Sequence, residues 1–275
     1  MEFYALGECA TDKIFIKKLK YLMMKLKIFF ITALLALAVN LQAQQFINKA
    51  SVEYEVKTNI KKTMGNSMWE EMMKEAMPNF KTAYYNFTFA NERSIYKFDH
   101  WNEKTKLPDY IKRNDEENVW YFDYAAGKYN MQKNVFGSAF NIADSIVPID
   151  WKLENESRVI AGFNCRKAVG KIMDSVYVFA FYTEEITVSG GPCSVSGLPG
   201  LILGLTIPRM YTSWVATKVM VNGVNESSIK PVTAKKYFTG NSLKLILKER
   251  MKEWISEDDP DANKWAEQLF WNVSL

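Results

Sequence analysis

The chain has 275 residues, of which 48% are hydrophobic and 24% charged, with 35 basic side chains against 31 acidic ones and one histidine. A net charge of only +4 argues against nucleic-acid binding, which needs a basic face, and one histidine argues against a histidine-based zinc site. A chain of this length can bury roughly 70% of its surface, so a single globular domain is expected.

An apolar stretch near the N-terminus predicts export. Two lysines precede the apolar run 28–39, and the small residue Ala43 follows shortly after it. This order is typical of a secretory signal peptide, and the run is shorter than the roughly 20 apolar residues of a membrane span. We expect cleavage after Ala43, with residues 1–22 as an extension ahead of a more natural start at Met23 or Met24. An uncleaved anchor or a core helix is the alternative.

The mature chain would then be 44–275, a single β-rich domain in the periplasm or outside the cell. Residues 1–43 contain six lysines and three acidic residues, so their removal leaves the domain nearly neutral. We expect no membrane span in this domain, no nucleic-acid partner and no cofactor.

The pattern along the mature chain predicts antiparallel sheet. In residues 51–57 apolar side chains alternate with polar ones, which is typical of a half-buried strand. Further strands are expected at 82–90, 93–98, 119–124, 128–133, 164–172, 175–182, 201–207 and 211–221. Short turn segments such as 91–92 join them into consecutive hairpins. Nine strands without strand–helix alternation predict an α+β fold that is mainly antiparallel β.

Few helices are expected. They are 68–77, 243–255 and a short last helix that opens at 260–261. The second can be capped by Asn241 or Ser242, and its apolar residues form one stripe that can face the core.

The first of these helices is rich in methionine. Met68, Met72 and Met73 recur near helical spacing, and Trp69 lies beside them. Three interpretations are open: a stripe that faces the core, a lid over an apolar ligand, and thioether ligands for Cu(I). Because methionine surfaces adapt to ligands of different shape, we take these four residues as the candidate ligand-binding residues.

Two cysteines follow the predicted leader, Cys165 and Cys193. An even number of cysteines in an exported chain predicts a disulfide. The alternative is two free or metal-binding thiols.

The sequence offers little for catalysis. The single histidine, His100, stands at the end of a predicted strand, and no Gly-x-Ser-x-Gly elbow is present. Glu184 and Glu185 are adjacent, so on a strand they would face opposite sides and make no acid–base pair. We therefore predict no catalytic residues.

The most specific motif is the hexapeptide of Gly197, Leu198, Pro199, Gly200, Leu201 and Ile202. It lacks the Lys-Ser/Thr of a phosphate-binding loop, and a predicted strand follows it rather than a helix. Its glycines and proline predict a turn before a buried strand. A structural corner and a rigid docking loop for a ligand or partner are both open.

Three upstream features accompany the hexapeptide: Trp151, the segment 160–168 with its Gly-Phe-Asn-Cys core, and the segment 181–186. Together these features resemble the GLPGLI family of Gram-negative bacteria, whose activity is undefined. The resemblance covers residues 151–205. Phe181 stands where a tryptophan is usual in the family, and Cys193 where an aromatic residue is usual.

Aromatic residues are plentiful, with 17 Phe, 14 Tyr and 8 Trp. A sheet so rich in them could wrap a cleft, which suggests comparison with the open half-barrel of periplasmic lipoprotein carriers, covered by helices. We predict a non-catalytic binding or carrier module for an apolar small molecule or an envelope protein. A structural or accessory partner of an outer-membrane transport system is the alternative, and a hydrolytic enzyme is third.

Overall fold

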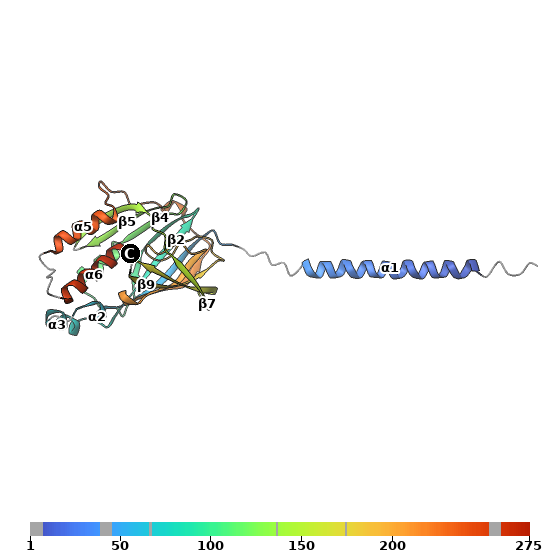
Figure 1. Ribbon diagram of the computed structural model, residues 1–275, viewed down its shortest axis with the longest axis horizontal. Helices are drawn as coiled ribbons and strands as arrows, with labels where there is room; N and C mark the ends of the chain where they lie inside the picture. The colour runs from blue at the N-terminus through green and yellow to red at the C-terminus, as the bar shows by residue number, and fades with distance from the viewer. Residues whose placement is uncertain (1–7, 39–45, 66–67, 136, 174, 253–259) are drawn as a thin grey trace, which may run out of the picture. The chain divides into compact units, whose positions relative to one another are not determined.

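The computed structural model describes residues 8–38, 46–65, 68–135, 137–173, 175–252 and 260–275, and the chain divides into two units, 1–45 and 46–275. The described part of the first unit is one helix, α1 (Glu8–Ala38), which contains most of the apolar run predicted to be a signal peptide (Figure 1). The predicted cleavage site at Ala43 lies outside the described residues. Among the described helices, none is both long and apolar enough to cross a bilayer. Because the structure does not test cleavage at Ala43, removal of the leader stays a prediction.

The described residues of the second unit form one open antiparallel sheet of 11 strands, so the predicted α+β fold is confirmed. The strands are β1 (Lys49–Asn59), β2 (Phe80–Ala90), β3 (Arg93–Trp101), β4 (Val119–Asp123), β5 (Lys128–Val135), β6 (Ser138–Ser145), β7 (Trp151–Ile160), β8 (Phe163–Ile172), β9 (Val176–Thr183), β10 (Leu201–Ile207) and β11 (Thr212–Met220). Their order across the sheet is β6-β5-β4-β3-β2-β1-β11-β10-β9-β8-β7. Strand β1 thus lies in the middle and joins two runs of consecutive hairpins.

Strand β7 shows that the open sheet is also curled. The side chain of Ile160, at the end of β7, lies 2.8 Å from the position that a Cβ on Gly204 of β10 would occupy, although β8 and β9 separate these strands in the sheet. The glycine therefore makes room for the edge strand to fold back. Twist of this kind is the usual behaviour of large antiparallel sheets.

Nine of these strands match the nine predicted from the sequence. The turn between β2 and β3 confirms the local reasoning: Asn91 and Glu92 both have left-handed φ angles, 51° and 57°, as a two-residue hairpin turn requires. Strands β6 and β7 were not predicted. In β7 most side chains are exposed, so the strand shows no apolar alternation that could have revealed it.

Five helices accompany the sheet in the described residues: α2 (Ile60–Thr63), α3 (Met68–Ala76), α4 (Asp109–Glu116), α5 (Gly240–Met251) and α6 (Pro260–Ser274). Two 3-10 turns, η1 (Pro208–Met210) and η2 (Glu226–Ser228), lie before and after β11. The predicted cap of α5 is wrong by two or three residues. Thr239 caps it, because its hydroxyl accepts from the amide of Ser242 and the Ser242 hydroxyl accepts from the amide of Thr239. Helices α2 and α4 were not predicted.

The core lies on one face of the sheet, which we call the inner face. Alternate residues of β1 and β2, such as Val52, Tyr54 and Phe87, are buried there, while their neighbours are partly exposed. Helices α5 and α6 lie beside strands β5 and β6 and cover this part of the sheet (Figure 1). The space between the inner face and the helices is the candidate place for a ligand site.

Candidate ligand-binding site

A cavity of about 460 Å³ lies between the inner face and helices α2, α4 and α6. Aromatic side chains from five positions make much of its wall: Tyr85, Tyr96, Trp101, Trp120 and Trp214. Small-molecule sites usually measure roughly 300–1,000 Å³ and are mostly apolar with a few polar groups. Both the size and the lining of this cavity fit that description.

The cavity has a buried floor and an exposed rim. Tyr96, Trp120 and Trp214 are each less than 5% exposed. At the rim, Lys81 of β2 and Asp115 of α4 form an ion pair with Nζ and Oδ2 2.5 Å apart, and both side chains are about one quarter exposed. A ligand that moves from this rim to the buried floor therefore loses its contact with water.

Lys133 places a positive charge on the floor. Residues alternate along β5, so Lys133 shares the inner face with Met131 and Val135, and it is only 6% exposed. Its Nζ lies 4.4 Å from the ring centroid of Trp120, a cation–π contact. Within the described part of the chain, no hydrogen bond or ion pair holds this ammonium group.

Burial sets the ionisation of Lys133. Desolvation lowers its pKa from 10.5 to about 8, against the opposing effects of Cys193 and Asp115, while the charge of Lys81 lowers it further. The residue therefore stays mainly protonated at neutral pH. A buried ammonium group without an ion-pair partner is energetically costly, so the fold alone does not offset the burial of Lys133.

Two further polar groups of the lining lack hydrogen-bond partners among the described residues: the hydroxyl of Tyr96 and Oδ1 of Asn134. Burial raises the pKa of Tyr96 well above its ordinary value, although the nearby indole of Trp214 acts in the opposite direction, so the hydroxyl keeps its proton and can donate. Buried polar groups normally have partners. Their concentration here distinguishes the cavity from a simple packing defect.

Cys193 also lines the cavity, but its thiol is not poised for chemistry. Burial raises its pKa to about 12, although the charge of Lys133 and the nearby indole of Trp214 act in the opposite direction. The thiolate is the nucleophile in cysteine chemistry, and a raised pKa keeps it scarce. Cys193 is therefore part of the cavity wall and a poor nucleophile.

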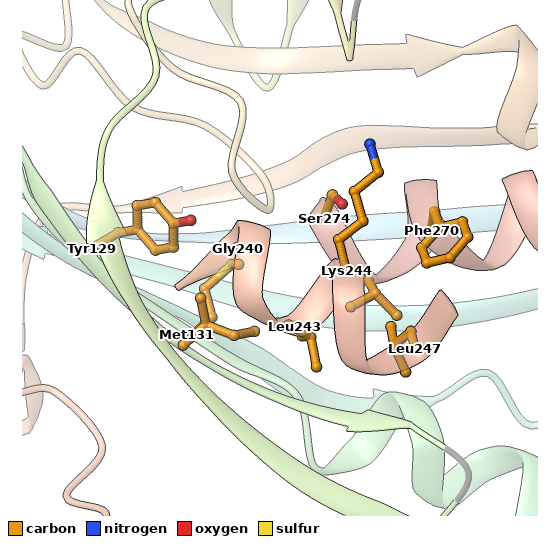
Figure 2. Close-up of a pocket in the computed structure, with 10 residues that line it drawn as sticks. Tyr129, Met131, Gly240, Leu243, Lys244, Leu247, Phe270 and Ser274 are labelled. Atoms are coloured by element: carbon orange, nitrogen blue, oxygen red, sulfur yellow. The ribbon is translucent and has the colours of Figure 1, made fainter. Parts of the chain in front are cut away.

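A second, much smaller cavity of about 60 Å³ lies between β5 and helices α5 and α6 (Figure 2). Leu243, Leu247 and Phe270 make its apolar wall, and the ammonium end of Lys244 extends away from these leucines. This volume holds a few water molecules, since each needs roughly 10–15 Å³ by this measure. It is too small for the ligand classes considered above.

The hexapeptide lies in neither of these cavities and forms a packed corner. Leu198, Leu201 and Ile202 are at most 1% exposed. Gly200 has a φ of +146°, and a Cβ there would lie 2.0 Å from the carbonyl oxygen of Thr183, so only glycine fits. These contacts favour the structural interpretation of the motif.

Two long-range hydrogen bonds tie this corner to the sheet. The indole N–H of Trp151 on β7 donates to the carbonyl of Ser196 at 3.0 Å. The hydroxyl of Tyr54 on the central strand β1 donates to the carbonyl of Ile202 at 2.6 Å. Trp151, the segment 181–186 and the hexapeptide thus come together in space, in the part of the sheet formed by β7, β9 and β10.

One segment of this part of the sheet matches a known protein family. A profile of a family described as a protein of unknown function (Porph_ging) matches residues 170–204, from the end of β8 to the beginning of β10. The chain thus matches a family of undefined function over this segment. No curated protein matches the sequence.

Similar solved structures share little sequence with the chain. PNGF-II in its P21 space group has 14% identity and a TM-score of 0.47, covering 72% of this chain and 33% of that one. The C2 form has 14% identity and a TM-score of 0.40, covering 81% and 32%. An uncharacterized conserved protein from Thermus thermophilus has 8% identity and a TM-score of 0.35, covering 68% and 88%. The chain spans about a third of the length of PNGF-II, and likenesses at these TM-scores support no conclusion about function.

The structure corrects the predicted methionine lid. Met68 is 90% exposed and Met72 58% exposed, and neither they nor Met73 line either cavity. The side chain of Trp69 lies outside the described part of the structure. The nine-residue helix α3 is held by polar contacts, such as Glu70 accepting from the amide of Gly65 at 2.8 Å, and the methionine that reaches the core follows its end. That residue is Met77, which is 7% exposed.

The predicted disulfide is also absent, because Cys165 and Cys193 are both free, buried thiols. They occupy different surroundings. The Cys165 thiol donates to the carbonyl of Phe163 on the same strand, whereas Cys193 lines the cavity. The alternative of two free thiols is the one that the structure contains.

His100 and the two glutamates lie away from the cavity. The ring of His100 stacks on Tyr84 with centroids 4.5 Å apart, and its Nδ1 lies 2.7 Å from the carboxylate of Asp99. Glu184 and Glu185 are exposed and lie in a turn after β9 rather than on a strand. Within the described residues, no group of three histidine, cysteine, aspartate or glutamate side chains could hold a metal ion.

The site residues that sequence reasoning missed are Lys133 and the aromatic wall. One signal could have found Lys133: in the run from Met131 to Val135, strand alternation places this lysine between two apolar residues on the buried face. An inward-facing lysine is rare enough to indicate a site. The helices that close the cavity carried no comparable signal.

Proposed function

We propose that this protein is an exported, non-catalytic binding module of the GLPGLI type. Its ligand would be a small, largely apolar molecule held in the cavity between the sheet and helices α2, α4 and α6. The observation that carries the proposal is the cavity itself, about 460 Å³ in volume and walled by buried aromatic side chains.

Two observations support a binding role over catalysis. The thiol in the cavity, Cys193, has a raised pKa and is a poor nucleophile. The single histidine, His100, lies outside both cavities, so the cavity lining contains no imidazole for general acid–base work.

Binding is tested with the neutral dye N-phenyl-1-naphthylamine, whose fluorescence rises in apolar surroundings. Ile111 of α4 lines the cavity, so Ile111→Trp should fill part of it and weaken dye binding by about tenfold or more. Arg113→Trp, which places the same indole at an exposed position of the same helix, is the matched control and should bind like wild type.

Failure of the wild-type protein to bind the dye would overturn the proposal, and so would equal binding by Ile111→Trp. The first result would favour the accessory partner of an outer-membrane transport system, which needs no small ligand. In that case a pull-down from envelope extract becomes the informative experiment.

Export is a separate part of the proposal with its own test. N-terminal sequencing of the mature protein should begin at Gln44, because the apolar run 28–39 and Ala43 form a signal peptide with its cleavage site. A mature protein that retains this run would contradict it.

A further inference from the structure

We propose that the ligand of this cavity is an apolar carboxylate, and that Lys133 is the residue that binds its head group. The inference rests on the proposed function, because it names the class of ligand that the same cavity takes. Its basis is the mismatch between the buried charge and the groups around it.

No carboxylate of the described residues pairs with Lys133. The aspartate of the cavity lining, Asp115, is already paired with Lys81 at 2.5 Å. Leu275, the last residue of the sequence, also lines the cavity; its terminal carboxylate accepts from the indole N–H of Trp120 at 2.8 Å and from the amide of Ser194 at 3.0 Å, and it forms no ion pair with Lys133 in the described structure. The ammonium group of Lys133 is left with the ring face of Trp120.

A carboxylate on the cavity floor would satisfy two groups at once. It would accept charge-assisted hydrogen bonds from the ammonium of Lys133 and a hydrogen bond from the hydroxyl of Tyr96, which has no partner among the described residues. A neutral alcohol head group offers less, because it supplies no charge to offset the buried ammonium group.

The rest of the cavity suits the apolar part of such a molecule. Above the floor the lining includes Val56, Ile60, Ile111 and Leu269 together with the rings already named. The polar residues Asn114 and Asn272 are exposed and mark the rim. A head group on the floor and a hydrocarbon body toward the rim is therefore the orientation that the charges dictate.

The test compares decanoate with 1-decanol, which has the same chain length and no charge, by displacement of N-phenyl-1-naphthylamine from the full chain. Decanoate should displace the dye from wild type at a concentration about tenfold lower than 1-decanol, as expected for a charge-assisted hydrogen bond. Lys133→Met should abolish this preference, so that decanoate and 1-decanol displace the dye from the variant at similar concentrations. Lys128→Met, an exposed lysine on the same strand, is the matched control and should keep the preference.

The outcomes separate the two proposals. If the dye binds but decanoate and 1-decanol compete equally, or if Lys133→Met keeps the preference, the inference is overturned and the binding function stands. If the dye does not bind wild type, the binding function falls and takes the inference with it. Circular dichroism of Lys133→Met and of a second variant, Lys133→Gln, shows that a lost preference does not reflect a lost fold.

Discussion

The two tyrosines Tyr54 and Tyr96 lie edge to face, 6.2 Å apart, and belong to two different regions of the same inner face. On the side of β7–β10, the hydroxyl of Tyr54 is used to hold the carbonyl of Ile202 in the hexapeptide. On the side of β2–β5, Tyr96 lines the cavity, and its buried hydroxyl has no hydrogen-bond partner among the described residues.

The difference shows that the most recognisable motif and the proposed ligand site lie in different parts of the sheet. The hexapeptide has the strongest sequence signal because its packing tolerates few residues, as Gly200 shows. The cavity floor has a weak signal because a binding site needs only a few polar groups on a scaffold of ordinary strands.

The largest expected effect falls on the packed region. Gly200→Ala should lower the free energy of unfolding by at least about 3 kcal/mol, because the left-handed φ and the clash with the Thr183 carbonyl add. Gly127→Ala, in a turn with φ +62° and open space around it, should cost about 1 kcal/mol. Urea unfolding measures both. Equal losses would show that the corner is no tighter than an ordinary turn.

The second effect has the opposite sign and belongs to the cavity. Lys133→Met should raise stability at pH 7 by on the order of 3 kcal/mol, the free energy that corresponds to lowering the pKa from 10.5 to about 8. Denaturant unfolding of variant and wild type at the same pH gives the difference. A destabilised, normally folded variant would mean that the lysine is a structural element.

The pH dependence of that difference sharpens the test. Below pH 8 the lysine is protonated in both states and the full penalty is present in wild type. Between pH 8 and 10.5 the unfolded state binds more protons, so wild-type stability rises relative to the variant. The advantage of Lys133→Met should therefore shrink over this window; an advantage that stays constant would contradict the assignment.

The tyrosine pair gives a third and smaller effect. Tyr54→Phe leaves the buried carbonyl of Ile202 without its partner and should cost about 1–3 kcal/mol. Tyr96→Phe removes a hydroxyl that has no partner among the described residues and should change stability by less than about 0.5 kcal/mol. Thermal unfolding of both variants measures the two losses of stability. A larger loss for Tyr96→Phe than for Tyr54→Phe would contradict the contrast drawn between the two regions.

The smallest effect concerns the cysteines. Because Cys165 and Cys193 are free and buried, reducing agent should leave the melting temperature of the unit 46–275 unchanged. A thiol reagent should titrate two groups only after unfolding. A melting temperature that falls on reduction would restore the disulfide that the sequence predicted.

The sheet could be predicted because strand periodicity is a local property. In β1 and β2 apolar residues recur at every second position, and Asn91 and Glu92 accept the backbone angles that the turn needs. Strand β7 escaped because an exposed edge strand imposes no such pattern. The pairing of β1 with β11 joins residues more than 150 positions apart in the sequence, and no local pattern encodes such a pairing.

The site was harder to predict than the fold. The methionine content of α3 suggested a ligand-binding helix. Composition does not say which face a short helix presents, however, and Met68 and Met72 lie at the surface. The cavity arises from segments distant in sequence, such as Ile60, Ile111 and Leu269, which come together only when the sheet is folded. Lys133 carried a local signal, as a lysine on the buried side of its strand, but the sequence analysis did not use it.

A native mass spectrum of the protein isolated from its natural source tests the central claim, that the region of β2–β5 is a ligand site. Wild type and Arg113→Trp should each carry a small bound molecule, seen as an added mass, because a cavity of about 460 Å³ with an apolar wall and a buried charge retains its ligand. Ile111→Trp should carry less of it or none. The bare polypeptide mass for all three proteins, or the same adduct on all three, would contradict the account.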